Sequence, residues 1–257
     1  AFPGGGAMWN TPVVDPATHT VYVLAGNPIP YSGLLRGAGK ELYSDSVLAI
    51  DTRTGKLKWY WQQTHHDIWD LDPTNPIILF DLPNGGKGLA YAGKTGWVYE
   101  LNRLNGKPLI AGNIVEKAVP QNAKSHTFAT QPYVTGDAFS HQCGTKALYA
   151  GKMAPDGKPY QNVGCIYAPY DDTGHVVFAP SALGGADWPP SAYSPVTNYQ
   201  YICSKESEAS FKAIPAEKQK LKALGDFSQV EGLTPGKGVN FKSTGSVVAM
   251  NLVTNKV

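Results

Sequence analysis

The densest group of chemically capable side chains in the sequence lies in the segment QQTHHDIWDLD, residues 62–72. It holds three carboxylates, two imidazoles and an indole, although only 16% of the chain is charged. Asp70 and Asp72 are two residues apart, so on an extended segment both carboxylates share one face. Such a pair suits a hard cation such as calcium, which takes several oxygen ligands. A turn with Asx caps and surface histidines is the alternative interpretation.

Three other residues of suitable type lie elsewhere in the sequence. Asn27 ends a predicted strand, where its amide oxygen could be a further metal ligand. Lys94 precedes another predicted strand, so it is either an exposed turn lysine or a cation for the oxygen atoms of a ligand. Trp9 lies in a repeated motif, where the common role of tryptophan is that of a core indole.

Two internal repeats indicate which elements position these residues. The run VLAIDTRTGKLKW at 47–59 recurs as VYELNRLNGKPL at 98–109 and weakly as VVAMNLVTNK at 247–256. Each copy has an apolar strand, a turn of Asp or Asn with Gly or Asn, and a second strand, which predicts a hairpin. A second motif, GGAMWNTPVVDPAT at 5–18, returns as GGADWPPSAYSPVT at 184–197.

Repeats of about 40–50 residues with four short strands are typical of a β-propeller. The sequence therefore predicts an all-β fold, a propeller of four-stranded blades, with residues 1–257 forming about four blades of a single domain. Chance hairpins in a β-sandwich are the alternative. Because the chain starts on a core motif and ends inside a hairpin, and open blades leave edge strands unpaired, we expect it to be part of a larger ring.

Two segments interrupt the repeats. Residues 113–180 are rich in Tyr, Gly and Pro and are predicted to form long loops over one propeller face. Glu206–Leu224 is predicted to be helical, as a short insertion over residues 205–225, with Pro215 near the helix start and Gly225 at its stop.

The composition excludes several classes of protein. A net charge of +2 argues against a nucleic-acid binder. The sequence also contains no run of about 18 apolar residues, the length that a membrane-spanning helix needs. The three cysteines lack C-x-x-C spacing, so neither a zinc ribbon nor a covalent haem site is indicated. One disulfide can form, and Cys143–Cys165 is the preferred pair because both residues lie in the same turn-rich insertion. Three reduced thiols are the alternative.

The sequence resembles the pyrroloquinoline quinone (PQQ) dependent dehydrogenases. The run AIDTRTGKLKW at 49–59 closely matches the tryptophan-docking motif of that family, and residues 62–70 match its active-site string Q-x-T-x-H-D-x-W-D. The pair His65-His66 resembles the membrane-associated glucose and polyol branch. The resemblance implies an eight-bladed propeller, of which this chain would be about half.

The resemblance also implies site roles. Asp70 matches the catalytic general base, Asn27 the asparagine that ligates the metal, and Trp9 the indole beneath the quinone ring. Lys94 matches the basic residue that hydrogen-bonds the quinone oxygens.

The pair Asp187-Trp188 matches a second motif that lines the cofactor pocket, where asparagine is common in place of the aspartate. Asp72 occurs in lanthanide-using methanol dehydrogenases and also in the double-histidine branch, which uses calcium or magnesium. The expected cofactors are therefore PQQ and Ca²⁺ held by Asn27, Asp70 and Asp72, with a lanthanide as the alternative metal.

The implied activity is oxidation of an alcohol, polyol or aldose hydroxyl by hydride transfer to metal-bound PQQ, with cytochrome c or a quinone as the external electron acceptor. The implied location is periplasmic or extracytoplasmic, with any membrane association made by segments outside this chain. The family's glutamate ligand and vicinal cysteine pair are missing here, so the remaining half of the propeller is an expected partner. A cofactor-free propeller scaffold or assembly protein and a carbohydrate-binding propeller are the alternatives.

Overall fold

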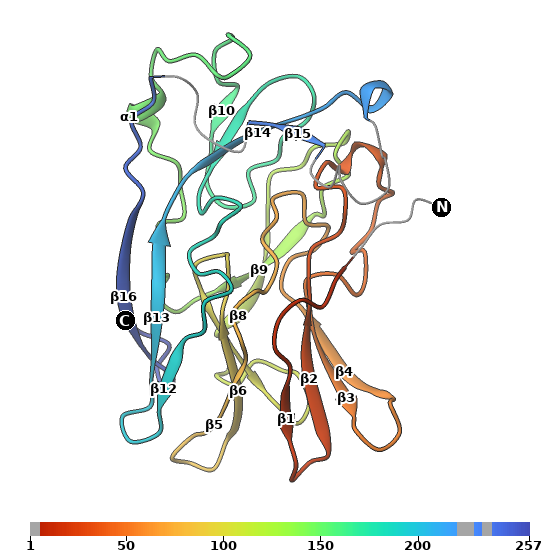
Figure 1. Ribbon diagram of the computed structural model, residues 1–257, viewed down its shortest axis with the longest axis vertical. Coiled ribbons are helices and arrows are strands. Elements are labelled where there is room, and N and C mark those ends of the chain that lie inside the picture. The colour runs from red at the N-terminus through yellow and green to blue at the C-terminus, as the bar shows by residue number, and fades with distance from the viewer. Residues whose placement is uncertain (1–5, 220–228, 233–237) are drawn as a thin grey trace.

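The computed structural model describes residues 6–219, 229–232 and 238–257, and its regular secondary structure is almost entirely β-strand (Figure 1). Its only α-helix in these ranges is the four-residue α1, Lys146–Tyr149. The strands are β1 (Val13–Asp15), β2 (Thr20–Ala25), β3 (Ser46–Asp51), β4 (Leu57–Gln62), β5 (Ile78–Asp81), β6 (Lys87–Ala92), β7 (Val98–Asn102), β8 (Ile114–Ala118), β9 (Thr130–Val134), β10 (Asn162–Val163), β11 (Val176–Phe178), β12 (Ala192–Ser194), β13 (Tyr199–Glu206), β14 (Ala209–Ala213), β15 (Val230–Glu231) and β16 (Thr244–Asn251).

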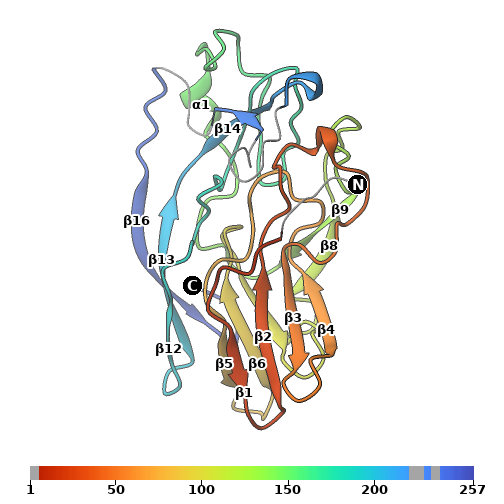
Figure 2. The same ribbon diagram turned by 45° about the vertical axis from the view of Figure 1, so that its right-hand side comes forward.

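The strands form separate small sheets that lie beside one another. The first is an antiparallel four-stranded sheet in the order β1-β2-β3-β4, followed by β5-β6-β7 and the pair β8-β9. Strands β12-β13-β16 form another sheet, and β10-β11-β14-β15 a fifth. In both views the turns β1–β2, β3–β4, β5–β6 and β12–β13 lie at the same end of the molecule (Figures 1 and 2). This arrangement of blade-like sheets confirms the prediction of an all-β, partial propeller.

The first sequence repeat produces three hairpins with the same turn chemistry. In each copy an Asp or Asn side chain accepts a hydrogen bond from the backbone N–H two residues on, and a Gly or Asn four residues on has a positive φ. The capping residues are Asp51, Asn102 and Asn251, and the residues with positive φ are Gly55, Gly106 and Asn255. The repeat is therefore a repeat of turn geometry, which residue type alone specifies.

Trp59 connects the first two sheets. Its indole Nε1 donates to the carbonyl of Arg103 at 3.1 Å, and its ring lies against Gly106, where an added Cβ would be 2.5 Å from a ring carbon. The Tyr22 ring also contacts the indole, with a centroid distance of 5.7 Å. The tryptophan of the docking motif thus packs on the turn of the next sheet.

The predicted helix at Glu206–Leu224 is wrong over the residues that the structure describes. Strand β13 runs through Glu206, strand β14 follows, and only a 3-10 turn at Ala216–Lys218 is helical. Ala209 and Phe211 are completely buried, and β14 pairs with both β11 and β15. Sheet pairing and burial therefore outweigh the helix propensity of the segment. Residues 220–224 lie outside the described residues.

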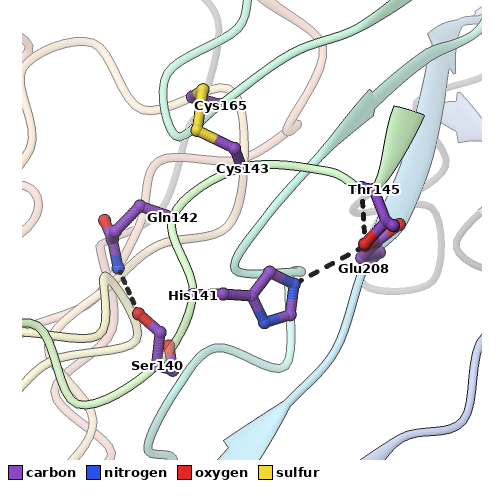
Figure 3. The surroundings of a disulfide bond; sticks show 7 residues. All are labelled: Ser140, His141, Gln142, Cys143, Thr145, Cys165 and Glu208. Carbon is purple, nitrogen blue, oxygen red and sulfur yellow. Dashed lines mark hydrogen bonds and ion pairs between the residues drawn. A yellow bond between two sulfur atoms is a disulfide. The ribbon is translucent and has the colours of Figure 1, made fainter. Parts of the chain in front are cut away.

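The stretch 113–180 begins with the hairpin β8–β9 and ends with β11. Long loops lie between them, and Cys143 and Cys165 form a disulfide there (Figure 3). The preferred cysteine pairing is confirmed, and Cys203 is free and exposed. Within the described residues, no helix is long and apolar enough to cross a bilayer.

Candidate active site

The segment after β4 is a tight loop organised by Asp67. One carboxylate oxygen of Asp67 accepts from the backbone N–H of Trp69 and the other from that of Leu71, both at 2.7 Å. Gln63 donates to the carbonyl of Leu71 at 2.5 Å. These bonds stabilise the loop locally, and they leave the side chains of Asp70 and Asp72 free for other contacts.

Residues from the long loops support this segment. The Trp69 indole donates to the carbonyl of Ala168 at 2.7 Å, and its ring contacts Tyr167 with a centroid distance of 5.4 Å. The hydroxyl of Tyr170 donates to the carbonyl of Ile68 at 2.5 Å. The loops therefore position the residues of the candidate site.

Asp70 and Asp72 meet at the ammonium group of Lys94. The Nζ atom lies 3.2 Å from Asp70 Oδ2 and 2.7 Å from Asp72 Oδ1. Lys94 is 5% exposed and Asp72 1% exposed, so the three charges interact away from solvent. Asp70 has a φ of +65°, a strained conformation for a residue with a side chain, and such strain is concentrated at functional sites.

Burial is the main influence on the charges of this group. It raises the pKa of Asp70 well above the ordinary value of a carboxyl, and the charge of Lys94 opposes the rise. For Lys94, burial acts to lower the pKa, but Asp72 and Asp70 outweigh it and raise the pKa. Burial thus increases the proton affinity of Asp70, and Lys94 limits that increase.

Trp9 is the second partner of Asp72. Its indole Nε1 donates to Asp72 Oδ2 at 3.1 Å. Gly26 lies at this contact, because a Cβ there would be 3.1 Å from Asp72 Oδ2 and 3.2 Å from Trp9 Nε1. Asn27, the next residue, has its amide nitrogen donating to the carbonyl of Pro28 at 3.2 Å. Trp9 and Asp72 thus meet from separate elements, while the Asn27 side chain makes its described hydrogen bond with its neighbour Pro28.

The second sequence repeat packs against Lys94. The backbone N–H of Gly185 donates to the carbonyl of Lys94 at 2.8 Å. Gly184 has a φ of +70°, and a Cβ there would be 2.5 Å from Lys94 Cα. The charge of Asp187 contributes to the raised pKa of Lys94. Asp187 is therefore near the group, as a residue that acts on Lys94 through its charge.

Trp188 is exposed, whereas Lys94 is buried. It is 65% exposed and lines a cavity of about 670 Å³ together with Trp9, which is 49% exposed. Two aromatic side chains on one cavity suit a flat, conjugated ligand. Asp70 lines a second cavity of about 450 Å³, which it shares with Tyr31.

Tyr31 is a site residue that the sequence did not indicate. Burial and the charge of Asp70 raise the pKa of its phenol, and a hydrogen bond with Asp70 contributes to the rise. Its carbonyl accepts from Arg36 Nη2 at 3.2 Å, which also donates to the carbonyl of Asp67 at 2.6 Å. The residue lies in a Pro-rich loop with no recognisable spacing, so only the fold shows its position.

The two histidines of the segment have structural roles. His65 lies between Gln62 Oε1 at 2.7 Å and Glu116 Oε1 at 2.9 Å. His66 contacts the carbonyls of Gly39 and Ser125 and is completely buried. Neither ring joins the group around Lys94 through these contacts.

The donor set is consistent with a hard cation. Asp70 and Asp72 already converge on one positive charge, and a metal ion favours the same pairing of carboxylates. No group of three or more His, Cys, Asp or Glu side chains that could hold a metal occurs within residues 6–219, 229–232 and 238–257. A metal ion bound by Asp70 and Asp72 would therefore need further ligands of another kind or from outside the described residues.

Comparisons with known proteins identify the family of this chain. The family model described as the glucose/ethanol/alcohol dehydrogenase β-propeller domain (PQQ) matches residues 2–254. Quinoprotein alcohol dehydrogenase PedH of Pseudomonas putida is 34% identical over 209 residues, which cover 79% of this chain and 30% of PedH. A probable quinate dehydrogenase (quinone) of Xanthomonas campestris pv. juglandis is 30% identical over 253 residues, which cover 91% of this chain and 31% of that protein.

Solved structures show the same relationship. The quinohemoprotein alcohol dehydrogenase of Comamonas testosteroni has a TM-score of 0.67 at 26% identity, over 98% of this chain and 34% of its own. A europium-containing methanol dehydrogenase shares the fold, with a TM-score of 0.70 at 22% identity over 98% of this chain and 39% of its own. The chain spans about a third of the length of these relatives. It belongs to the PQQ family of glucose, ethanol and alcohol dehydrogenase β-propeller domains.

Proposed function

We propose that the protein containing this chain is a PQQ-dependent dehydrogenase that oxidises a CH–OH group, with Asp70 as general base. The observation that supports the proposal most directly is that Asp70 and Asp72 meet at Lys94 while the Trp9 indole donates to Asp72. When bound, PQQ supplies the acceptor for the hydride of the alcohol carbon, and a metal ion supplies a Lewis acid. The protein residues orient the reactants and move the proton.

Each residue has a proposed part in this chemistry. Asp70 accepts the hydroxyl proton of the substrate, for which its raised pKa is suited. Asn27, Asp70 and Asp72 are the proposed metal ligands. Calcium is the expected metal, and a lanthanide is the alternative that the europium-containing relative suggests.

The remaining roles concern the cofactor. Trp9 and Trp188, on their shared cavity, would hold the ring system by stacking. Lys94 would stabilise negative charge on the cofactor oxygens, and Asp187 would act on Lys94 through its charge.

Other features of the proposal concern the whole protein. Electrons leave to an external acceptor, either cytochrome c or a quinone. The similarity to a quinohemoprotein alcohol dehydrogenase supports the cytochrome as acceptor. We propose a periplasmic or extracytoplasmic location, and the disulfide agrees with it because disulfides persist in oxidising compartments. The relatives' names include ethanol, 1-butanol and quinate dehydrogenases, so the comparisons do not select one substrate.

The test uses the full-length protein. The expected result is about one equivalent of PQQ per chain in the protein from its native source, and dye-linked alcohol oxidation that is lost in Asp70→Asn while PQQ remains bound. Full oxidation by Asp70→Asn would contradict its role as base. Absence of PQQ after reconstitution with calcium or a lanthanide would favour a cofactor-free scaffold, and sugar binding without oxidation would favour a carbohydrate-binding propeller.

A further inference from the structure

We propose that the cavity beside Asp70 selects an alcohol that also carries a carboxylate, and that Lys205 binds this carboxylate. The inference rests on the proposed function, since it names the substrate class for the same site. The charged residues that line this cavity differ in whether they have ion-pair partners.

The cavity is enclosed by elements far apart in the sequence. Asp70 and Tyr31 lie on it, and so do residues at the junction of β13 and β14. Its volume of about 450 Å³ is in the range of pockets for small molecules. The remaining lining residues are Ser181, Ala182, Leu183, Lys205, Ser207, Glu208, Phe241 and Ser243.

The two acidic residues on this cavity already have partners. Asp70 pairs with Lys94 at 3.2 Å. Glu208 Oε1 accepts from the backbone N–H and the hydroxyl of Thr145, at 2.9 and 2.6 Å (Figure 3). His141 Nε2 lies 3.6 Å from the same oxygen, Nδ1 of the same ring contacts Glu206, and Glu208 and Glu206 raise the pKa of His141. A raised pKa favours the imidazolium, which then lies between Glu208 and Glu206.

Lys205 differs from these residues because it makes no ion pair with any residue in the described part of the chain. It is half-buried at the end of β13, where it pairs with Gly245 of β16. Its backbone N–H donates to the carbonyl of Gly185 at 2.8 Å, and Gly185 in turn donates to the carbonyl of Lys94 at 2.8 Å. The strand position of Lys205 is thus fixed relative to the residue that holds Asp70.

An ammonium group that forms no ion pair with a described residue, at a partly buried cavity, attracts an anion, because the low local dielectric strengthens the interaction. The side chains of Leu183 and Phe241 provide apolar contacts for a carbon skeleton. A single lysine balances one negative charge, so it suits a carboxylate better than a phosphate dianion. A hydroxy acid can therefore place its hydroxyl at Asp70 and its carboxylate at Lys205.

The experiment uses the full-length protein reconstituted with PQQ and calcium. The substrates are trans-4-hydroxycyclohexanecarboxylate and its methyl ester, which share a ring and a reacting hydroxyl and differ in charge. We expect kcat/KM to be about tenfold higher for the carboxylate, mainly through KM, since a hydrogen bond to a charged group is stronger than one between neutral groups. Lys205→Gln should lose most of this preference, and Lys205→Arg should retain it.

Lys242→Gln is the matched control, because Lys242 is exposed, lies next to Phe241 and does not line the cavity. It removes the same charge and should keep the preference for the carboxylate. Equal loss of preference in Lys205→Gln and Lys242→Gln would overturn the proposal, as would a wild-type protein that favours the ester.

A binding measurement separates this inference from the proposed function. Calorimetry with cyclohexanecarboxylate, which has no hydroxyl to oxidise, should show binding that Lys205→Gln weakens about tenfold. Binding through Lys205 without any alcohol oxidation would support the anion site and contradict the dehydrogenase activity. Oxidation of alcohols without binding of this carboxylate would support the dehydrogenase activity and contradict the anion site.

Discussion

The ammonium group of Lys94 lies 2.7 Å from the carboxylate of Asp72, and both side chains are almost completely buried. A buried ion pair of this kind stabilises a fold little by itself, since both charges lose their hydration. Removal of one partner is different, because the other charge then stays buried without compensation. Lys94 therefore has a structural role before any cofactor binds, as the positive charge between Asp70 and Asp72.

Lys94→Gln should destabilise the full-length apoprotein, prepared without PQQ and metal, by about 3–5 kcal/mol, the cost typical of a broken buried pair. Millimolar calcium should restore more stability to Lys94→Gln than to the wild type, because the metal replaces the missing charge. The measurement is the melting temperature with and without calcium.

Lys256→Gln is the control for this prediction. Lys256 pairs with Asp137 at 2.9 Å, but both side chains are exposed, so the loss should be at most about 1 kcal/mol. An equal calcium effect on wild type, Lys94→Gln and Lys256→Gln would show that calcium does not bind between the carboxylates.

The contact between Trp59 and Gly106 predicts a second effect. Gly106→Ala places a methyl group against the indole and strains a φ of +71°. It should therefore lower the free energy of unfolding by about 1–3 kcal/mol more than the backbone strain alone would. Gly112→Ala isolates the strain, because Gly112 has a φ of +73° and an added Cβ would have no neighbour within 4 Å. Equal melting temperatures of the two variants would mean that Trp59 moves aside freely and does not lock the sheets.

The sequence predicted most securely the features that depend on local chemistry. The turns around Asp51, Asn102 and Asn251 follow from residue type, since an Asx cap and a positive φ suffice to form them. The family resemblance also pointed to Asp70 and Lys94. Asp70 lies between β4 and β5 and Lys94 between β6 and β7, and the structure brings their charged atoms to 3.2 Å from each other.

Features that depend on tertiary packing could not be predicted in this way. Strand β14 contains residues that favour helix, and it is a strand because β11 and β15 lie on either side of it. Tyr31 and Lys205 carry no motif, and they reach the cavity of Asp70 only through the packing of distant loops and strands. Their place in the site is therefore a property of the fold rather than of any short pattern.

The disulfide gives a third prediction. It joins residues 22 apart in the sequence, so Cys143→Ser combined with Cys165→Ser should lower the free energy of unfolding by about 3 kcal/mol, mainly by freeing the unfolded chain. Hydrogen bonds on both sides of the disulfide, from Gly144 to Gly164 and from Ile166 to Gln142, should keep the native loop in place. Cys203→Ser is the control and should leave the melting temperature unchanged. A double variant as stable as the wild type in the absence of reductant would contradict the prediction.

Glu100 should make the stability of the protein depend on pH. Its side chain is completely buried, with Oε1 accepting from Asn255 Nδ2 at 2.8 Å and Oε2 without a hydrogen-bond partner in the described residues. Burial raises its pKa from 4.5 to about 8. Between these values the folded protein binds a proton that the unfolded chain does not, so this contribution to stability is complete below pH 4.5 and is lost as pH rises through 8.

Glu100→Gln keeps the shape of the side chain and removes the charge that forms at high pH. The melting temperature of Glu100→Gln relative to wild type should therefore rise steadily between pH 5 and pH 8, and level off above the pKa of about 8. Thermal unfolding of both proteins across this range is the measurement. A difference that stays constant with pH would mean that Glu100 titrates alike in the folded and unfolded states, and that water or a cation reaches its second oxygen.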